Sequence, residues 1–548
     1  MRRAALLALA LAGASGCKHA APGGRAPASP SAVPLVAVAE LHGTTEPCGC
    51  NSDPLGDLAR VVRLAHGGLL LDAGDALYDP AAADHRGQAD LKAEAIAGVY
   101  ARNAAEAALG PADLIAGVER VGLPRQACNV SLGEPAMAPP RVREVRGLRV
   151  GVFGAADPAR IDAAMDKLRW RGRPPPAEDP IPAARAAVAA LAADRAEVVV
   201  ALLAMTRTDA RKLVAAVPGI DFAIVGLEVG EGMVEPEPVG DGWLLAPADQ
   251  GRRAARLEIV RGAAPAGTRL RPARFDGEAG RARGLERLDR RIAALREQLA
   301  AWRGDKTADA TFVAAREAEL AAQGAARAEL AAAATPAPSP PYFTYSLVPV
   351  RRALPRDPDV VAKLQALDRA IGKSNLEAAQ KEAPPAPAKD RPSYVGGAAC
   401  VRCHKAAAAF WDKTRHAQAW KTLVDVDKQY NYDCTGCHVT GWMEPGGVHL
   451  ASAEPRGLVN VQCEVCHGPG SRHVEEAGLD DPKTMKPGPE ADLCRARCHT
   501  KEHSDTFALE PYLRDVLGPG HGEKRRKALG DGPTGHELRQ KALAAPRP

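Results

Sequence analysis

Short runs of Val, Leu and Ile alternate with Ala-rich stretches over residues 34–265. The runs are bounded by Gly, Pro or Asp, and they are continuously apolar instead of alternating with polar residues. Continuous apolar runs of this length are typical of strands that are covered on both faces of their sheet. The pattern therefore predicts an α/β domain whose strands include residues 35–41, 68–73, 148–154, 198–203 and 220–226.

A helical periodicity follows this domain. Apolar residues recur at alternating spacings of three and four at Leu285, Leu288, Ile292, Leu295, Leu299 and Trp302. That spacing forms the apolar seam of a helix that packs on another helix, and Glu/Ala-rich helical sequence resumes over residues 310–333. We predict a helical hairpin over residues 280–335 that braces neighbouring domains. A strand at 343–350 and a helix at 358–380 are expected after it.

Composition limits what the chain can be. Its 548 residues are too many for one core and predict two to four domains. Charged residues make up 25% and hydrophobic residues 46%, which excludes disorder throughout. The formal net charge of +5 is small for this length, so we expect no binding of nucleic acid.

The N-terminus has the basic, apolar and small-residue order of a secretory signal. Residues 14–17, Ala-Ser-Gly-Cys, resemble the bacterial lipobox, in which the cysteine is lipidated, so Cys17 is the predicted membrane anchor. Ordinary cleavage, which would give a soluble periplasmic protein, is the alternative. No later segment approaches the roughly 18 apolar residues that a membrane span needs. Both alternatives predict an exported, periplasmic protein.

Together these patterns divide the chain into eight segments. They are a signal peptide at 1–17, a tether at 18–33, an α/β domain at 34–265, the hairpin at 280–335, a strand-helix connector at 342–382, a Pro/Ala linker at 383–393, a Cys/His-rich domain at 394–525 and a charged tail at 526–548.

The Cys/His-rich domain contains three Cys-x-x-Cys-His motifs and a fourth with one more residue between its cysteines. Two thiols on one helical turn can reach both vinyl groups of a porphyrin, while the adjacent imidazole lies under the iron. We therefore expect four c-type haems, with the proximal ligands His404, His438, His467 and His499. The attachment cysteines are Cys400, Cys403, Cys434, Cys437, Cys463, Cys466, Cys494 and Cys498.

Other interpretations of the paired cysteines explain less. Zinc favours Cys-x-x-Cys pairs but does not explain a histidine directly after every second cysteine. A thioredoxin-like redox pair would need a βαβ frame around it. For Cys494 and Cys498 alone, a structural disulfide stays open as the alternative.

Further histidines could supply the second axial ligands. His473 and His521 follow Gly/Pro turns that could direct a side chain towards a neighbouring haem, and His416 follows the first motif. We predict these three as distal ligands and regard His449 and His503 as possible ones. Ligation by two imidazoles implies low-potential electron carriers.

Residues 394–522 resemble the tetrahaem cytochrome c-554 family, which shares a Cys-Glu-x-Cys-His-Gly-Pro-Gly-Ser-x-His stretch with residues 463–473. The resemblance implies a mostly α-helical and irregular domain whose closely spaced haems pass single electrons to redox partner proteins. In some members of the family one iron lacks a distal protein ligand. The longer loop after Cys494 departs from the family pattern and leaves attachment of the fourth haem in question.

Residues 34–261 resemble the 5′-nucleotidase branch of the calcineurin-like metallophosphoesterases, which implies a layered α-β-β-α sandwich. That family binds two metal ions through Asp-x-His, Gly-Asp, Gly-Asn-His-Asp and later histidines. Here Asp-x-His is replaced by residues 40–42, Glu-Leu-His, and Gly-Asn-His-Asp by residues 110–113, Gly-Pro-Ala-Asp. The later histidines are replaced by apolar or acidic residues. We expect no intact di-metal site and no phosphoesterase turnover, although Glu40, His42 and Asp75 could hold one ion.

Three cysteines lie outside the haem motifs and the lipobox: Cys48, Cys50 and Cys128. They predict either a disulfide from Cys128 to the loop of Cys48 and Cys50, or redox-active thiols that exchange electrons with the haems.

Three functions remain in order of preference. The first is an electron-transfer protein whose α/β domain is a docking or sensing platform. The second is a multihaem oxidoreductase for a small nitrogen or sulfur compound, and the third is an active phosphohydrolase.

Overall fold

A computed structural model describes residues 32–545 except 48, 81–85, 118–123, 134–136, 168–176, 276, 305–308, 333–339, 388, 390, 477–484, 487, 489–490 and 502. The predicted signal peptide, Cys17 and Cys48 therefore lie outside the described residues. Within the described ranges, none of the helices combines the length and the apolar character that a membrane span requires.

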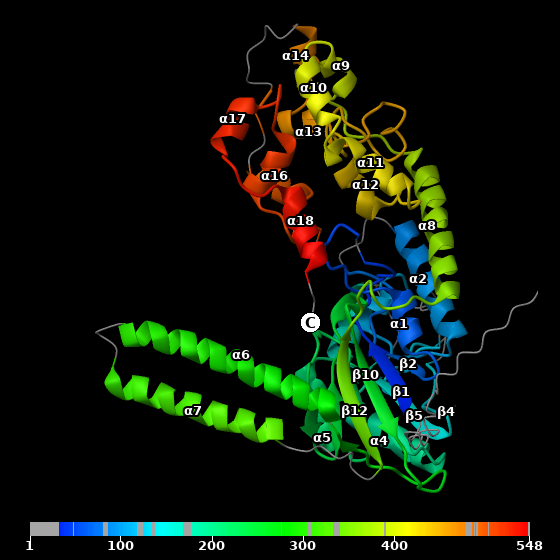
Figure 1. The fold of residues 1–548 in the computed structure, drawn as a ribbon. Helices are drawn as coiled ribbons and strands as arrows, with labels where there is room; N and C mark the ends of the chain where they lie inside the picture. The colour runs from blue at the N-terminus through cyan, green and yellow to red at the C-terminus, as the bar shows by residue number, and fades with distance from the viewer. Residues whose placement is uncertain are drawn as a thin grey trace, which may run out of the picture.

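Two six-stranded sheets form the α/β part of the chain (Figure 1). The first sheet has the order β11 (Ala273–Arg274), β12 (Tyr342–Pro349), β10 (Arg253–Val260), β1 (Val33–Val38), β2 (Leu69–Asp72) and β3 (Glu106–Ala107). The second has the order β4 (Arg141–Val145), β5 (Leu148–Ala156), β6 (Val198–Ala204), β7 (Phe222–Val225), β9 (Gly242–Leu245) and β8 (Glu237–Val239).

Strand β1 shows how the layers are built. Its side chains alternate between two apolar clusters, because successive residues of a strand point to opposite faces. Leu35 and Ala37 join the cluster shared with the second sheet, whereas Val36 and Val38 pack under helices. These helices are α1 (Leu58–Leu64), α2 (Arg86–Arg102) and α8 (Pro358–Ala379), while α3 (Pro158–Lys167), α4 (Pro180–Ala193) and α5 (Arg207–Ala216) cover the second sheet. The predicted α-β-β-α sandwich is confirmed.

The segment 342–382, predicted as a connector, is built into this sandwich. β12 pairs antiparallel with β10 along its whole length, from Tyr342 opposite Val260 to Pro349 opposite Arg253. Its apolar side chains explain the pairing, since Phe343 and Tyr345 are buried in the cluster between the sheets. Helix α8 buries Val360, Leu364, Leu367 and Ile371 in the cluster under α1 and α2. The α/β domain therefore extends beyond residue 265, and the hairpin is an insertion in it.

The hairpin consists of α6 (Gly277–Gly304) and α7 (Ala310–Ala332). Ile292, Leu295 and Leu299 of the predicted seam are buried, and Trp302 meets Phe312 edge-on at 4.9 Å between ring centres. Figure 1 shows the hairpin projecting away from the sheets and from the Cys/His-rich region. In the part of the chain that the structure describes, the hairpin extends outward from the edge strand β11 and does not lie between the two regions, so the expected bracing of two domains is not observed there.

Short helices and turns make up the Cys/His-rich region. They are α9 (Gly397–Val401), α10 (Lys405–Trp411), η4 (Arg415–Gln418), α11 (Ala419–Val424), α12 (Tyr432–His438), α13 (Cys463–His467), α14 (Ser471–Glu475), α15 (Ala491–Arg497) and α16 (Leu509–Val516). The segment predicted as a charged tail forms α17 (Glu523–Ala528) and α18 (Gly535–Ala544), of which α18 packs on α16. The region is mostly helical and irregular, as predicted.

Candidate functional site: four histidine-bearing motifs beside an α/β domain

The motif histidines are held in tight helical turns, as the first and fourth motifs show. In the first motif, the amide of His404 donates to the carbonyl of Cys400 at 2.9 Å, an ordinary i to i+4 contact. In the fourth motif, the amide of His499 donates to the carbonyl of Cys494 at 2.8 Å, which is an i to i+5 contact. This is a π-type turn, which absorbs one extra residue within a helix. The longer loop therefore returns its histidine to the same hydrogen-bonding relation with the first cysteine.

Three of the four motif histidines lie opposite a second histidine. The ring centres of His404 and His473 are 6.2 Å apart, and the rings are inclined by only 23°. His499 lies 6.3 Å from His416, and His467 lies 6.1 Å from His521. The structure thus brings each of the three predicted distal histidines to a different motif.

The imidazoles of these pairs are set up to accept a metal. Burial lowers the pKa of His499 to about 4, and burial also lowers the pKa of His416, so both rings are neutral near pH 7. The Nδ1 atoms of His467 and His521 lie 2.7 and 2.8 Å from the carbonyl oxygens of Lys486 and Val516. A carbonyl only accepts, so each Nδ1 carries the proton and Nε2 is the available ligand atom.

His438 of the second motif is different. Its Nδ1 donates to the carbonyl of Ala419 at 2.6 Å, which again leaves Nε2 as the ligand atom. Among the residues that the structure describes, no other histidine ring lies opposite it at a comparable distance. The possible ligands His449 and His503 have local contacts instead: His449 accepts from the amide of Ala451, and His503 contacts the Thr500 hydroxyl.

Cysteines of different motifs also lie together. The thiol of Cys400 lies close enough to that of Cys463 to interact with it, and the same holds for Cys437 and Cys498. The first motif is therefore adjacent to the third, and the second to the fourth.

The second motif is docked on the α/β domain. The side-chain carbonyl of Gln88 on α2 accepts from the side-chain amide of Asn375 at 2.7 Å and from the Tyr432 backbone at 3.2 Å. The same Asn375 amide donates to the Tyr430 carbonyl at 2.9 Å. Gln88 and Asn375 are 3% and 4% exposed, so this network is a buried link to helix α12.

Ion pairs surround that buried link. Lys92 lies 2.6 Å from Asp433, and Lys428 lies 2.8 Å from Glu46. Burial would raise the pKa of Glu46, but the charges of Lys428 and Arg356 outweigh it and lower the pKa. Sequence reasoning missed all of these residues, because none of them belongs to a motif.

The loop of Cys50 contacts the region of the fourth motif. The Ser52 amide donates to Asp505 at 3.0 Å, and Arg539 of α18 donates to the Gly49 carbonyl at 3.3 Å. Cys128 lies elsewhere, half-buried against the cluster between the sheets, and forms no disulfide with a described residue. Burial raises the pKa of the Cys128 thiol to about 12, which disfavours the reactive thiolate at neutral pH.

Glu40, His42 and Asp75 converge at the carboxyl ends of β1 and β2, with ligand atoms within 4.8 Å of one another. All three have positive φ, of 47°, 49° and 58°, which is a strained backbone for residues other than glycine. Burial raises the pKa of Asp75 to about 6. Burial would lower the pKa of His42, but the neighbouring carboxylates of Asp75 and Glu40 outweigh it and raise the pKa.

Behind this cluster lies a buried cation that the sequence did not reveal. Arg125 is fully buried, its guanidinium is 3.8 Å from the buried carboxylate of Asp113, and the charge of buried Asp72 also acts on it. Asp113 in turn accepts from the amides of Asp75, Leu77 and Gly110. An internal guanidinium thus partly neutralises the carboxylates behind the Glu40, His42 and Asp75 cluster.

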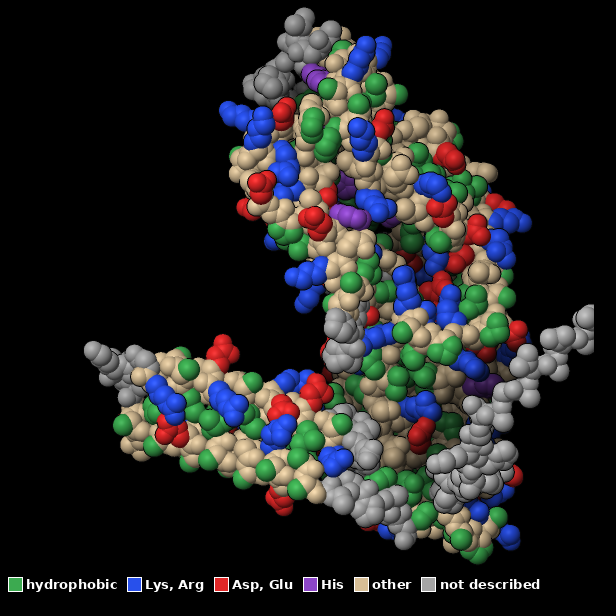
Figure 2. All heavy atoms as spheres, viewed as in Figure 1, with side chains coloured by type: hydrophobic (Ala, Val, Ile, Leu, Met, Phe, Trp, Pro, Cys, Tyr) green, Lys and Arg blue, Asp and Glu red, His purple; other side chains and the backbone are tan. Residues whose placement is uncertain are grey.

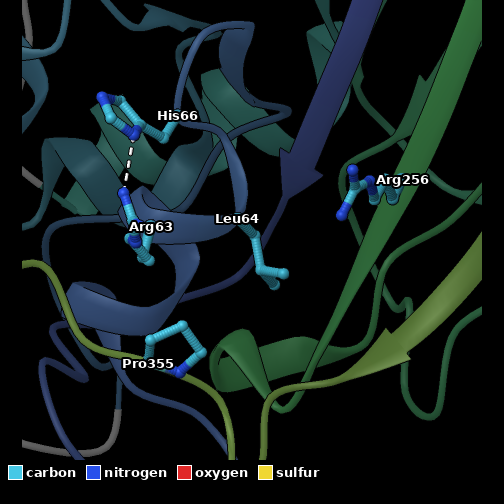
Figure 3. A pocket seen from close by; sticks show the side chains of 5 residues that line it. All are labelled: Arg63, Leu64, His66, Arg256 and Pro355. Carbon is cyan, nitrogen blue, oxygen red and sulfur yellow. Dashed lines mark hydrogen bonds between the residues drawn. The ribbon is translucent and has the colours of Figure 1, made fainter. Parts of the chain in front are cut away.

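A surface pocket of about 260 Å³ lies elsewhere on the α/β domain and is lined by Arg63, Leu64, His66, Arg256 and Pro355 (Figure 3). Arg63 donates to Nδ1 of His66 at 2.7 Å, and Arg256 stands opposite on β10. None of the motif residues and none of the Glu40, His42 and Asp75 cluster lines it.

Comparison with solved structures gives weak matches for the chain as a whole. A 5′-nucleotidase precursor from Thermus thermophilus covers 71% of this chain and 68% of its own, at 18% identity and a TM-score of 0.40. The sulfate thiohydrolase SoxB from the same species covers 67% and 63%, at 16% identity and a TM-score of 0.40. The calcineurin-like phosphoesterase YfkN from Bacillus subtilis covers 43% and 87%, at 18% identity and a TM-score of 0.34.

Sequence comparison gives a local and specific match. Cytochrome c-554 of Nitrosomonas europaea is 36% identical over 126 residues, which are 20% of this chain and 53% of the relative. The chain thus spans about half the length of this curated relative. Residues 399–468, which contain the first three motifs, match the family model for cytochrome c554 and c-prime, so this part of the chain is a cytochrome c-554-like region.

Proposed function

We propose that this chain is an exported multihaem c-type cytochrome that passes electrons through four covalently attached haems. The observation that carries the proposal is the pairing of three motif histidines with a second histidine at 6.1 to 6.3 Å between ring centres. Two bonds of about 2.0 Å to one metal, plus about 1.1 Å from each nitrogen to its ring centre, span about 6 Å. The distance between the ring centres of each histidine pair therefore matches the distance expected for two imidazoles that bind one iron.

Bound haems would supply one-electron carriers of low potential, because three irons would have two imidazole ligands each. The chain's own residues fix their spacing. Contacts between Cys400 and Cys463, and between Cys437 and Cys498, bring the attachment points together in two pairs. The π-type turn at Cys494 favours a fourth haem over a disulfide, because it preserves the position of His499.

A haem count tests this function. After maturation in a host that attaches c-type haem, we expect a pyridine haemochrome assay to give four haems per chain, and three for Cys494→Ala/Cys498→Ala. His473→Ala, His416→Ala and His521→Ala should each convert one low-spin iron to high spin in electron paramagnetic resonance. His503→Ala, an exposed histidine outside the pairs, is the control. Colourless wild-type protein would overturn the proposal.

A second candidate function, an oxidoreductase for a small nitrogen or sulfur compound, is favoured by His438. It is the motif histidine without a second ring opposite it among the described residues. An iron held there would have an open position. Binding of carbon monoxide to one iron per chain would support this candidate, and fully low-spin protein that ignores carbon monoxide and nitric oxide would contradict it.

For the α/β domain we propose a platform without phosphoesterase turnover. The positions of the family's later histidines hold Ala204 and Leu227, which are buried apolar residues. Glu40, His42 and Asp75 remain a candidate site for one ion, whereas the family reaction uses two. Release of phosphate from nucleotides with added divalent metal would contradict this proposal.

The remaining proposals concern the termini and thiols. Lipidation of Cys17 would anchor the periplasmic protein to a membrane, and mass spectrometry of the mature N-terminus tests it. Redox activity of Cys48 and Cys50 is supported by the contact of the Cys50 loop with the fourth-motif region. Thiol titration before and after mild reduction tests it.

A further inference from the structure

The haem-motif region has one end on the α/β domain and one free end. The second motif is held by Gln88 and Asn375, whereas α9, α10 and α14 lie at the tip that is farthest from the sheets (Figure 1). The first motif, at this tip, is the only one of the four whose second cysteine, Cys403, is exposed. Val401, within the same motif, is 44% exposed.

Two basic segments meet at this tip. Residues 401–415 contain four Lys and Arg against one Asp, and residues 523–527 contain four against one Glu. They are neighbours because Phe410 lies 6.2 Å from His521, and because a Cβ on Gly520 would come within 2.5 Å of Ala406. We call this surface the basic tip; its exposed cations include Arg402, Lys405, Lys413, Arg415, Lys524 and Lys527.

The charge of the basic tip is local. Figure 2 shows Lys and Arg side chains gathered over α17 and near α9 and α10. Glu475 and Glu476 of the neighbouring segment are exposed acidic residues that partly oppose them. Around the second motif, in contrast, residues 421–433 contain two Lys and three Asp.

We propose that the basic tip is the docking surface for an acidic electron-transfer protein, and this rests on the proposed haem function. An exposed motif cysteine, an apolar residue beside it and a surrounding set of cations are what a transient redox interface requires. Such interfaces are small, and complementary charge speeds encounter instead of adding strong affinity. The partner fitted by this surface has acidic side chains around its own cofactor, and one electron crosses per encounter.

The test is reduction of the haem-loaded full chain by a reduced plant-type ferredoxin, an acidic one-electron donor, in a stopped-flow instrument. We expect the second-order rate constant to fall steeply as ionic strength rises. The triple variant Arg402→Glu/Lys405→Glu/Lys413→Glu should have a rate constant about tenfold lower at low salt. Its rate constants at low and at high salt should then be equal. The matched control is the triple variant Arg296→Glu/Lys373→Glu/Lys381→Glu, which changes the net charge by the same amount. Its three positions are exposed and lie on α6, on α8 and just after α8.

Equal slowing in both triple variants would show an effect of net charge alone and would overturn the basic tip as the docking surface. A rate that does not depend on salt would overturn it as well. Haem counts and absorption spectra of all three proteins separate this result from failure of the haem proposal, which would remove the colour of the wild type.

Discussion

The α/β domain and the haem-motif region keep their structures in different ways. The sheets bury two large apolar clusters, one between them and one under α1, α2 and α8. Among its described residues, the haem-motif region has one small cluster, made of Trp420, Val439, Val448, Ala453 and Leu458. The first region can be stable by burial of its own side chains. The second has too few for that, so its stability must come from attached cofactors and from docking on the first.

Removal of the haems should have the largest effect and should act on one region. In a variant with Ser at all eight motif cysteines, we expect residues 394–525 to lose protection in hydrogen exchange while β1, β5 and β6 stay protected. The reason is that covalent haems supply the missing apolar contacts of the small cluster. Equal protection of residues 394–525 with and without haem would show that this region folds on its own core.

Loss of the buried cation should have the next largest effect, on the other region. Arg125→Leu leaves the buried carboxylates of Asp72 and Asp113 without their guanidinium, which should destabilise the α/β domain by about 3–5 kcal/mol at pH 7. Denaturant unfolding, followed through signals of the α/β domain, measures it.

Arg185→Leu is the matched control for this change, because Arg185 is exposed and, among the described residues, donates to the Ala216 carbonyl. It should cost less than about 1 kcal/mol. A similar loss in both variants would mean that the buried ionic cluster has no special role.

The same contrast explains what the sequence could predict. Apolar periodicity predicted the strands and the hairpin, because both are patterned locally. It did not assign β12 and α8 to the α/β domain, since the hairpin insertion separates them from β10 in the chain. Gly/Pro turns pointed to His473 and His521, and position after the first motif pointed to His416, but neither signal showed which motif each histidine faces. Gln88, Asn375 and Arg125 act through contacts between distant segments and leave no local signal.

The stability of the α/β domain should depend on pH through the buried carboxyl group of Asp72. Burial raises the pKa of Asp72 to about 7, so the folded α/β domain holds a proton that the unfolded chain releases near pH 4. This proton stabilises the folded α/β domain by up to about 4 kcal/mol, an effect that is complete below about pH 4 and is lost as pH rises through about 7.

Thermal melting of the α/β domain between pH 4 and 8 should show this loss of stability, and Asp72→Asn should remove most of the pH dependence. An unchanged slope in Asp72→Asn would assign the effect to Asp75 or Asp221, whose pKa values burial also raises to about 6.

The smallest effect should appear where the two regions meet. Asn375→Leu removes the buried amide that donates to Gln88 and to the half-buried Tyr430 carbonyl, at a cost of about 1–3 kcal/mol. Because this link holds helix α12, hydrogen exchange should speed up in residues 430–438 and the spectrum of the second haem alone should shift.

Lys92→Met is the control, since its pair with the half-exposed Asp433 should be worth less than about 1 kcal/mol. If Asn375→Leu changed the exchange of β1 and β2 but not that of α12, the buried amide would serve the α/β domain alone, and the two regions would be joined by their surface ion pairs.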